Sequence, residues 1–314
     1  MPESQKLVLL VASGITGLLV GSFLNVCIFR LPRNCMSIVK PRSRCPRCLH
    51  LIVWYDNFPV LSWLLLGGKC RSCRTPISPR YALIELLTGA LYLYAGWRSL
   101  YVRPPDWREA VTFATLAWFL GALVVCTFID LDFRILPDEV TIPGVVIGIV
   151  LSAVFPFLHQ AGRLPSFSFP VLSFGAGARL SSFLSHPLAG SLLGAAIGWG
   201  TIYSIGVLGK WVFRKKIERL GETEAMGFGD VKYMAMLGAV LGWKGVLLAL
   251  VLSCLYGSVF GIGKAILLRR MGYVPFGPFL SGGALTMVFW PGTVDRLIRA
   301  YMAWMNELTA ALLR

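Results

Sequence analysis

Charged residues are scarce in this chain of 314 residues. They make up 14% of the sequence, where a soluble domain carries about 25%, while 56% of the residues are hydrophobic and the mean hydropathy is +0.69. This scarcity excludes a single water-soluble domain. Recurrent stretches of about 20 residues without charge predict several membrane-spanning helices. We therefore expect an all-α, polytopic membrane protein.

Acidic residues are the scarcest charged type, with 15 Asp and Glu against 30 Lys and Arg. In a soluble protein this excess would suggest a nucleic-acid partner, but in a membrane protein basic residues collect in cytoplasmic loops. We expect no nucleic-acid partner. A dinucleotide-binding glycine fingerprint is also lacking, and Gly263-Lys264 is followed by Ala265, which excludes a phosphate-binding loop there.

The apolar stretches predict about eight spans. Residues 7–29 are too long for a signal-peptide core and lack a small-residue cleavage site after them, so we interpret them as a retained span. The expected spans are 7–29, 81–100, 110–129, 140–158, 188–213, two within 233–268 that turn at 242–245, and 273–291.

Four segments follow from this pattern. Residues 1–30 hold the first helix, 31–80 a small polar domain, 81–292 a seven-helix membrane core, and 293–314 an amphipathic segment expected at the membrane interface. A long loop at about 159–187 belongs to the core. If 31–80 is cytoplasmic, cytoplasmic loops hold 18 Lys and Arg and the other side holds ten, with two inside spans. This bias predicts both termini on the outer side.

Two C-x2-C pairs lie in the polar domain, with 21 residues between them: Cys45-Pro-Arg-Cys48 and Cys70-Arg-Ser-Cys73. Four thiolates fill a tetrahedral structural zinc site, so we expect zinc that supports the fold and does not catalyse. The alternatives are two disulfides or inert thiols, and His50 is a competing ligand. Cys27, Cys126 and Cys254 lie in spans and are interpreted as packing residues, while Cys35 has no assignment.

Two aspartates lie at the ends of predicted spans. Asp130 closes the third span, and Asp230 opens the sixth within Gly227-Phe-Gly-Asp-Val-Lys232. The predicted topology puts both at the cytoplasmic boundary. Two carboxylates in a partly dry site share a proton, so that one acts as base and the other as acid, which is aspartic-protease chemistry. Gly227 and Gly229 would let a substrate backbone approach Asp230 closely.

Other interpretations of these acids stay open. Asp230 also fits a helix N-cap, and Asp132, Asp138 and Glu139 are nearby alternatives to Asp130, although acids at 138 and 139 also suit the start of a helix. Glu85, inside the second span, is either functional or hydrogen-bonded within the bundle. We expect Glu85 and Lys232 to support the site.

The motifs together resemble the bacterial prepilin peptidases, also called type IV prepilin leader peptidases and N-methyltransferases. The matching segments are the two cysteine pairs and Gly21-Ser-Phe-Leu-Asn-Val26, Arg30-Leu-Pro32, Trp54-Tyr-Asp-Asn57, Pro79-Arg-Tyr81, Glu85-Leu-Leu-Thr88, Ile129-Asp130, Leu136-Pro-Asp138, Gly227-Phe-Gly-Asp-Val-Lys232 and Pro275-Phe-Gly-Pro278. The resemblance covers nearly the whole chain.

The resemblance implies an eight-span, GxGD-type aspartic peptidase of the inner membrane, with Asp130 and Asp230 as its catalytic pair and its active site facing the cytoplasm. Such an enzyme cuts class III leaders of prepilins, or of the pseudopilins of type II secretion, after a glycine. It then methylates the new N-terminal amine with S-adenosylmethionine. The residues that bind this cofactor are unassigned, and we expect the segment around 30–80 to participate.

Two departures from the family pattern concern the core. Ala225 stands where the family often has glycine, in Ala225-Met226-Gly227, and the stretch 159–187 is longer than in many members. Neither departure removes a catalytic residue. The rival hypotheses are a proton or ion transporter, which leaves the cysteines unexplained, a non-catalytic assembly factor that docks through the basic cysteine domain, and another type of intramembrane aspartyl protease.

Overall fold

The computed structural model describes residues 2–33, 37–40, 42–104, 106–159, 164, 186–212, 214, 226–268 and 274–312. The described residues are mostly helical, and their β structure is limited to two isolated bridges, Arg44 with Leu51 and Lys69 with Pro76. The chain divides into two compact units, Met1–Val140 and Thr141–Arg314. The all-helical architecture predicted from composition is confirmed for these residues.

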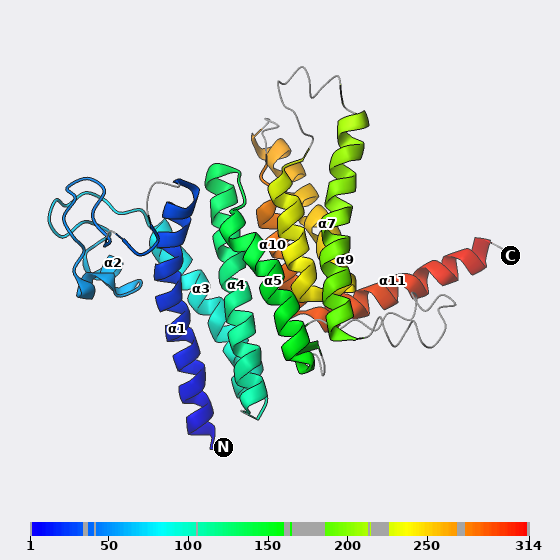
Figure 1. Ribbon diagram of the computed structural model, residues 1–314, viewed down its shortest axis with the longest axis horizontal. Coiled ribbons are helices and arrows are strands. Elements are labelled where there is room, and N and C mark those ends of the chain that lie inside the picture. The colour runs from blue at the N-terminus through cyan, green and yellow to red at the C-terminus, as the bar shows by residue number, and fades with distance from the viewer. Residues whose placement is uncertain are drawn as a thin grey trace. The chain divides into compact units, whose positions relative to one another are not determined.

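The first unit contains three long helices, α1 (Glu3–Arg30), α3 (Arg80–Gly96) and α4 (Trp107–Phe133). Its shorter elements are η1 (Leu31–Arg33), η2 (Trp54–Asn57), α2 (Leu61–Leu65) and η3 (Trp97–Tyr101). Figure 1 shows the cysteine-bearing segment beside α1, towards the C-terminal end of that helix. The polar domain predicted between the first two spans therefore lies at one end of the α1–α3 pair.

Small residues let α1 and α3 approach each other closely. A Cβ atom added to Gly21 would lie 2.8 Å from the Cα atom of Glu85, and one added to Gly17 would lie 2.9 Å from the Cα atom of Gly89. Backbone contact of this kind is the usual way that helices pack in lipid. The buried core beside it includes Leu24, Cys27, Ile28, Ile84, Val124, Val125 and Ile129.

The second unit contains most of α5 (Asp138–Val154), then η4 (Pro156–His159), α7 (Pro187–Val212), α9 (Phe228–Leu268), α10 (Gly277–Phe289) and α11 (Pro291–Leu312). Gly242 interrupts α9 with a φ of 72°, a value that suits glycine. A Cβ atom on Gly198 of α7 would meet both Met234 before this break and Val246 after it. The two arms of α9 therefore fold back on each other at the turn expected from the sequence.

Within the described ranges, four helices are long and apolar enough to cross a membrane: α1 with its extension to Arg33, α4, α7 and α9. Both α3 and α5 have 17 residues, and α10 has 13. These helices support a multi-pass membrane protein, while the count of eight spans stays a prediction. Nearly all of the expected loop at 159–187, and Cys35, lie outside the described residues.

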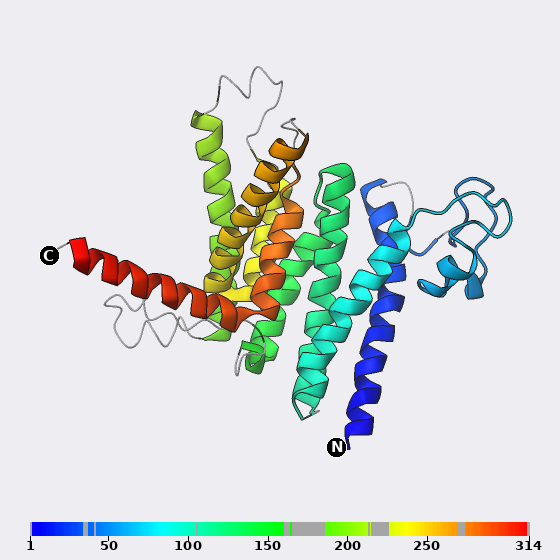
Figure 2. The same ribbon diagram turned by 180° about the vertical axis from the view of Figure 1, so that it is seen from behind.

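The last helix of the second unit, α11, runs across the direction of α10, as both ribbon views show (Figure 2). Four of its apolar residues are 40–66% exposed: Leu297, Tyr301, Trp304 and Leu308. Their spacing places them on one helix face. The Asp295–Arg299 ion pair lies outside this face. The helix thus presents a continuous apolar face with two aromatic rings.

Candidate functional site

The first cysteine pair forms a tight turn. The backbone N–H of Cys45 donates to the carbonyl of His50 at 3.0 Å, and the N–H of Leu49 donates to the carbonyl of Cys45 at 3.0 Å. Leu49 directly follows Cys48 and has a φ of 58°, which is uncommon for a residue other than glycine. These bonds turn the chain sharply so that Cys45 and Cys48 present their sulfurs to the same side.

The second cysteine pair repeats this turn 25 positions later. Cys70 donates its N–H to the carbonyl of Thr75 at 2.8 Å, Arg74 donates its N–H to the carbonyl of Cys70 at 3.0 Å, and the φ of Arg74 is 56°. An antiparallel bridge flanks each turn, at Arg44 and Leu51 and again at Lys69 and Pro76. The 31–80 segment is thus built from two equivalent knuckles.

The four sulfurs meet at metal-ligand spacing. The Sγ atoms of Cys45, Cys48, Cys70 and Cys73 all lie within 4.8 Å of one another. Those of Cys45 and Cys73 are 3.8 Å apart, which is the separation expected for two thiolates bound tetrahedrally at about 2.3 Å from a zinc ion. The four cysteines are free rather than disulfide-bonded, and the His50 side chain is not part of the group.

The chemistry of the thiols also suits a metal. Hydrogen bonds from the side chain and backbone of Thr75 lower the pKa of Cys73 to about 6. The pKa of Cys45 is lowered as well, chiefly by backbone N–H groups of Cys48 and Arg47, whereas desolvation and the neighbouring cysteine side chains raise the pKa of Cys48 to about 11. Thiolates are the form that binds metal. The cluster is therefore compatible with a structural zinc ion that all four sulfurs would hold, which leaves no coordination position for substrate.

One ion pair stabilises the cysteine domain away from the sulfurs. Arg71, from the second knuckle, donates two hydrogen bonds to the carboxylate of Asp56 at 2.7 and 2.6 Å. The Arg71 hydrogen bond holds the pKa of Asp56 below its ordinary value. Because Asp56 lies in η2, the pair ties this short helix to the second knuckle.

Glu85 connects the membrane helices to the same domain. It lies in α3 and is 8% exposed, and its Oε2 atom accepts a hydrogen bond of 2.7 Å from the backbone N–H of Val60. Val60 has a φ of 59° and precedes α2. Of the two interpretations from sequence, the structure shows Glu85 hydrogen-bonded, both to the cysteine domain through Val60 and to Ser22 of α1. The sequence gives no signal for Val60 as a partner, 25 residues away.

Asp130 lies in the last turn of α4 and is 6% exposed. Arg134 adopts a left-handed conformation with a φ of 58° and ends the helix, and its N–H donates to the carbonyl of Asp130 at 2.9 Å. Pro137 then directs the chain into α5, because proline suits the residues just before or at a helix start. This local sequence fixes the Asp130 carboxyl at the end of a buried helix.

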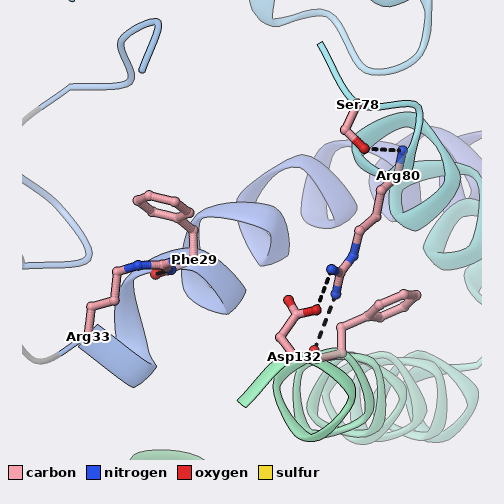
Figure 3. Close-up of polar contacts among 6 residues, drawn as sticks. Phe29, Arg33, Ser78, Arg80 and Asp132 are labelled. Carbon is pink, nitrogen blue, oxygen red and sulfur yellow. Dashed lines mark hydrogen bonds and ion pairs between the residues drawn. The ribbon is translucent and has the colours of Figure 1, made fainter. Parts of the chain in front are cut away.

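The neighbouring acids have different surroundings. Asp132 forms an ion pair with Arg80 at 2.5 Å, and the Arg80 guanidinium also donates to the carbonyl of Phe128 at 3.3 Å (Figure 3). Asp138 and Glu139 are exposed in the first turn of α5. Of the four acids between 130 and 139, only Asp130 is buried.

Asp230 lies in the first turn of α9 and is partly buried. Its N–H donates to the carbonyl of Gly227 at 3.1 Å. A Cβ atom at Gly227 would lie 3.5 Å from the Oδ2 atom of Asp230, so glycine keeps the space beside the carboxyl open. Gly229 is partly buried in the same turn, and the ammonium of Lys232 lies 5.0 Å from the centre of the Phe228 ring.

A buried polar contact that sequence reasoning missed fixes this end of α9. The hydroxyl of Tyr233, which is fully buried, is 2.6 Å from the hydroxyl of Ser281 in α10. Ser281 in turn donates to the carbonyl of Gly277 at 3.0 Å. The bond couples the Asp230 turn to the Pro275-Phe-Gly-Pro278 motif. The only signals in the sequence are a tyrosine and a serine within apolar stretches, 48 residues apart.

Asp130 belongs to the first unit and Asp230 to the second. The structure thus brings together the four cysteines, and places Glu85 against the cysteine domain. Gly227 and Lys232 lie in the same turn region as Asp230. The pairing of the two aspartates stays a prediction.

Two family models match the chain. The bacterial peptidase A24 N-terminal domain matches residues 15–99, and the type IV leader peptidase family matches residues 117–262. No solved structure matches the chain. The first match includes all four clustered cysteines and Glu85, and the second includes Asp130 and Asp230.

Curated relatives named prepilin leader peptidase/N-methyltransferase are similar over most of the chain. One from Myxococcus xanthus is 38% identical over 82% of this chain, which spans 64% of that relative. One from Aeromonas salmonicida is 34% identical over 89% of this chain and 90% of the relative. One from Pseudomonas aeruginosa is 32% identical over 95% of each.

Proposed function

This chain belongs to the type IV leader peptidase family, and from that premise we propose that it is a bifunctional prepilin peptidase of the bacterial inner membrane. It cleaves class III leader peptides of type IV prepilins, or of type II secretion pseudopilins, and then methylates the new N-terminal amine with S-adenosylmethionine. The resemblance inferred from the motifs is confirmed. The transporter and the non-catalytic assembly factor are not favoured, because the relatives are named as enzymes.

The observation that carries the peptidase proposal is the burial of Asp130 alone among the four acids between 130 and 139. The Arg80 ion pair gives Asp132 a structural partner, and Asp138 and Glu139 are solvent-exposed. Burying a carboxyl at the end of a membrane helix costs free energy, so a buried carboxyl there is a candidate for a functional residue. It therefore supports Asp130 as one member of an aspartyl dyad, with Asp230 as the other.

The two carboxyls of such a dyad divide the work, because one is a carboxylate at rest and acts as the base while the other holds the proton and acts as the acid. Asp230 lies at the N-terminal end of α9, and Asp130 lies at the C-terminal end of α4.

Cleavage then follows the dyad mechanism. One carboxylate of the dyad takes a proton from water, whose oxygen attacks the carbonyl carbon of the scissile peptide bond. The other, protonated carboxyl donates its proton to the carbonyl oxygen as that oxygen becomes negative. As the tetrahedral intermediate collapses, the C–N bond breaks, the departing amine receives the proton that had been taken from water, and the carboxyl that had donated takes a proton back from one hydroxyl of the intermediate. Gly227 and Gly229 leave room for the substrate backbone, and Lys232 supports the turn.

Methylation is proposed from family membership. S-adenosylmethionine supplies a methyl group, and the deprotonated N-terminal amine is the nucleophile. We place this step at the cytoplasmic segment 31–80 and assign none of its residues to the cofactor. The four clustered cysteines hold a structural zinc ion that keeps the segment folded.

The orientation is also part of the proposal. Eight spans with both termini on the periplasmic side place the cysteine domain and both aspartates at the cytoplasmic face, in accord with the excess of Lys and Arg in those loops. The α11 helix would then lie along the periplasmic surface. The substrates are membrane-held prepilins or pseudopilins.

The test is mass spectrometry of a prepilin incubated in detergent with S-adenosylmethionine and the purified protein. We expect a mass loss equal to the leader and a gain of one methyl group. Asp130→Asn and Asp230→Asn should leave the precursor uncut, while Asp138→Asn, a matched change at an exposed acid, should retain cleavage. Substantial cleavage by Asp130→Asn or by Asp230→Asn would contradict the assignment. A cut but unmethylated product would remove the second activity alone.

A further inference from the structure

A cavity of about 310 Å³ opens in the first unit between the C-terminal end of α1 and the cysteine domain. Its wall includes Phe23, Val26 and Arg30 from α1, and Arg42, Trp54 and Asn57 from the domain. Two of these residues are arginines, and none of the described residues that line the cavity is acidic. The cavity therefore favours a negatively charged ligand.

Arg30 is held rigidly at this cavity. The residue is 7% exposed, and its Nη1 atom donates to the carbonyls of Ser37 and Ile38 at 2.8 and 3.2 Å. These contacts fix the direction of a guanidinium that is largely removed from water. A buried, preorganised arginine binds phosphate or carboxylate more strongly than a mobile surface cation does. Arg42, from the opposite wall, is exposed and adds a second cation.

An apolar stripe of α1 leads directly to the cavity. Val11, Ile15, Leu19 and Phe23 are each 50–54% exposed. Their regular spacing of four residues places them on one face of the helix, and Val26 and Arg30 lie further along this side of α1. Within a membrane this stripe contacts acyl chains. This side of α1 thus changes from apolar to cationic at the end of the span.

We propose that this cavity binds the phosphate headgroup of an anionic phospholipid whose acyl chains lie along the exposed face of α1. The ligand must carry both a negative charge and a long apolar part, because the exposed apolar stripe of α1 leads to a cavity lined by Arg30 and Arg42. Trp54, 72% exposed at the rim, has the amphipathic ring that is enriched at the headgroup level of membranes. Anionic lipid near Arg and Lys is also favoured by charge.

A soluble methyl donor fits this site less well. S-adenosylmethionine carries a sulfonium, an ammonium and one carboxylate, so its net charge is positive, and it has no long apolar part; two arginines without a lining carboxylate disfavour such a ligand. The proposed lipid site does not depend on the proposed peptidase and methyltransferase activities. It depends on α1 lying in the membrane and on the cavity at its C-terminal end.

The test measures binding of short-chain phosphatidylglycerol to the full-length protein in a neutral detergent, with short-chain phosphatidylcholine and glycerol 3-phosphate as comparisons. We expect phosphatidylglycerol to bind most tightly of the three, and Arg42→Gln to weaken it by up to about fivefold, the range for an exposed ion pair. Arg44→Gln is the matched control, because Arg44 is exposed two positions away and does not line the cavity. It should leave binding unchanged.

Three outcomes with the two lipids, the arginine variants and S-adenosylmethionine would overturn the proposal, and a fourth concerns glycerol 3-phosphate. The three are equal binding of phosphatidylglycerol and phosphatidylcholine, an equal loss in Arg42→Gln and Arg44→Gln, and displacement of phosphatidylglycerol by S-adenosylmethionine. Binding of glycerol 3-phosphate as tightly as phosphatidylglycerol would show an anion site without a lipid and would also contradict it. Zinc content and thermal unfolding of each variant establish that the fold is intact.

Discussion

Replacing Glu85 by Ala should release the cysteine domain locally from the membrane helices. The carboxylate of Glu85 accepts the backbone N–H of Val60 at 2.7 Å, and the Ser22 hydroxyl also hydrogen-bonds this carboxyl. Because Glu85 is only 8% exposed, water replaces these contacts poorly. A hydrogen bond to a charged group contributes about 1.5–3 kcal/mol. We take about 2 kcal/mol for the loss at Val60, which corresponds to about a 30-fold change in a local opening equilibrium.

Hydrogen exchange of backbone amides measures this opening directly, since local opening controls exchange of protected amides. The Glu85→Ala protein should exchange about 30-fold faster than the unaltered protein in peptides that contain Val60. Glu85→Gln keeps an acceptor oxygen and should fall between the two. Glu139→Gln, which changes an exposed acid, should have no effect. Unchanged exchange around Val60 in Glu85→Ala, with the fold intact, would refute the connection between α3 and the domain.

Three further predictions concern the metal cluster, an ion pair and helix packing. Cys73→Ser should reduce bound zinc from one ion per chain to a small fraction, measured by elemental analysis; full retention would contradict a four-cysteine site. The lowered pKa of Asp56 implies that the Arg71 pair stabilises the domain above the ordinary carboxyl pKa of about 3.9 and that this stability is lost as pH falls through the lower folded value. As pH falls from about 5 to about 2, proteolysis of the domain should therefore increase less steeply in Asp56→Asn than in the unaltered protein. Gly194→Ala should destabilise the protein by about 1–3 kcal/mol, because its Cβ would collide with the backbone of Gly238 and Gly242 in α9. A Cβ atom at Gly190 would meet nothing within 4 Å, so Gly190→Ala should unfold at the same temperature as the unaltered protein. Equal losses of stability in the two variants would contradict close packing at Gly194.

The features predictable from the sequence are those that local pattern dictates. Apolar periodicity and length located the long helices, and Gly242 allowed the chain to turn within a stretch too long for one span. The two C-x2-C pairs predicted that all four cysteine sulfurs would lie together, because each knuckle presents both of its sulfurs to one side. The burial of Asp130, by contrast, depends on how α4 packs.

The contacts that sequence could not supply join residues far apart in the chain. Glu85 meets Val60, Arg80 meets Asp132 across 52 positions, and Tyr233 meets Ser281. In each case the sequence offers several polar residues that could form the hydrogen bond, and their local sequence patterns are alike. Which of them form the bond depends on how the helices pack. For the same reason, the spacing of Asp130 and Asp230 along the chain could not establish their pairing.

The central claim, that Asp130 and Asp230 act as one dyad, is tested most directly by cleavage rates of a single prepilin with four proteins. These are the unaltered protein, Asp130→Asn, Asp230→Asn and the double variant, each shown to retain its zinc and its thermal unfolding transition. Because residues that act as a unit are not additive, the account predicts that either single change reduces cleavage to background and that the double variant is no slower. Substantial cleavage by either single variant, or a double variant much slower than both, would contradict it.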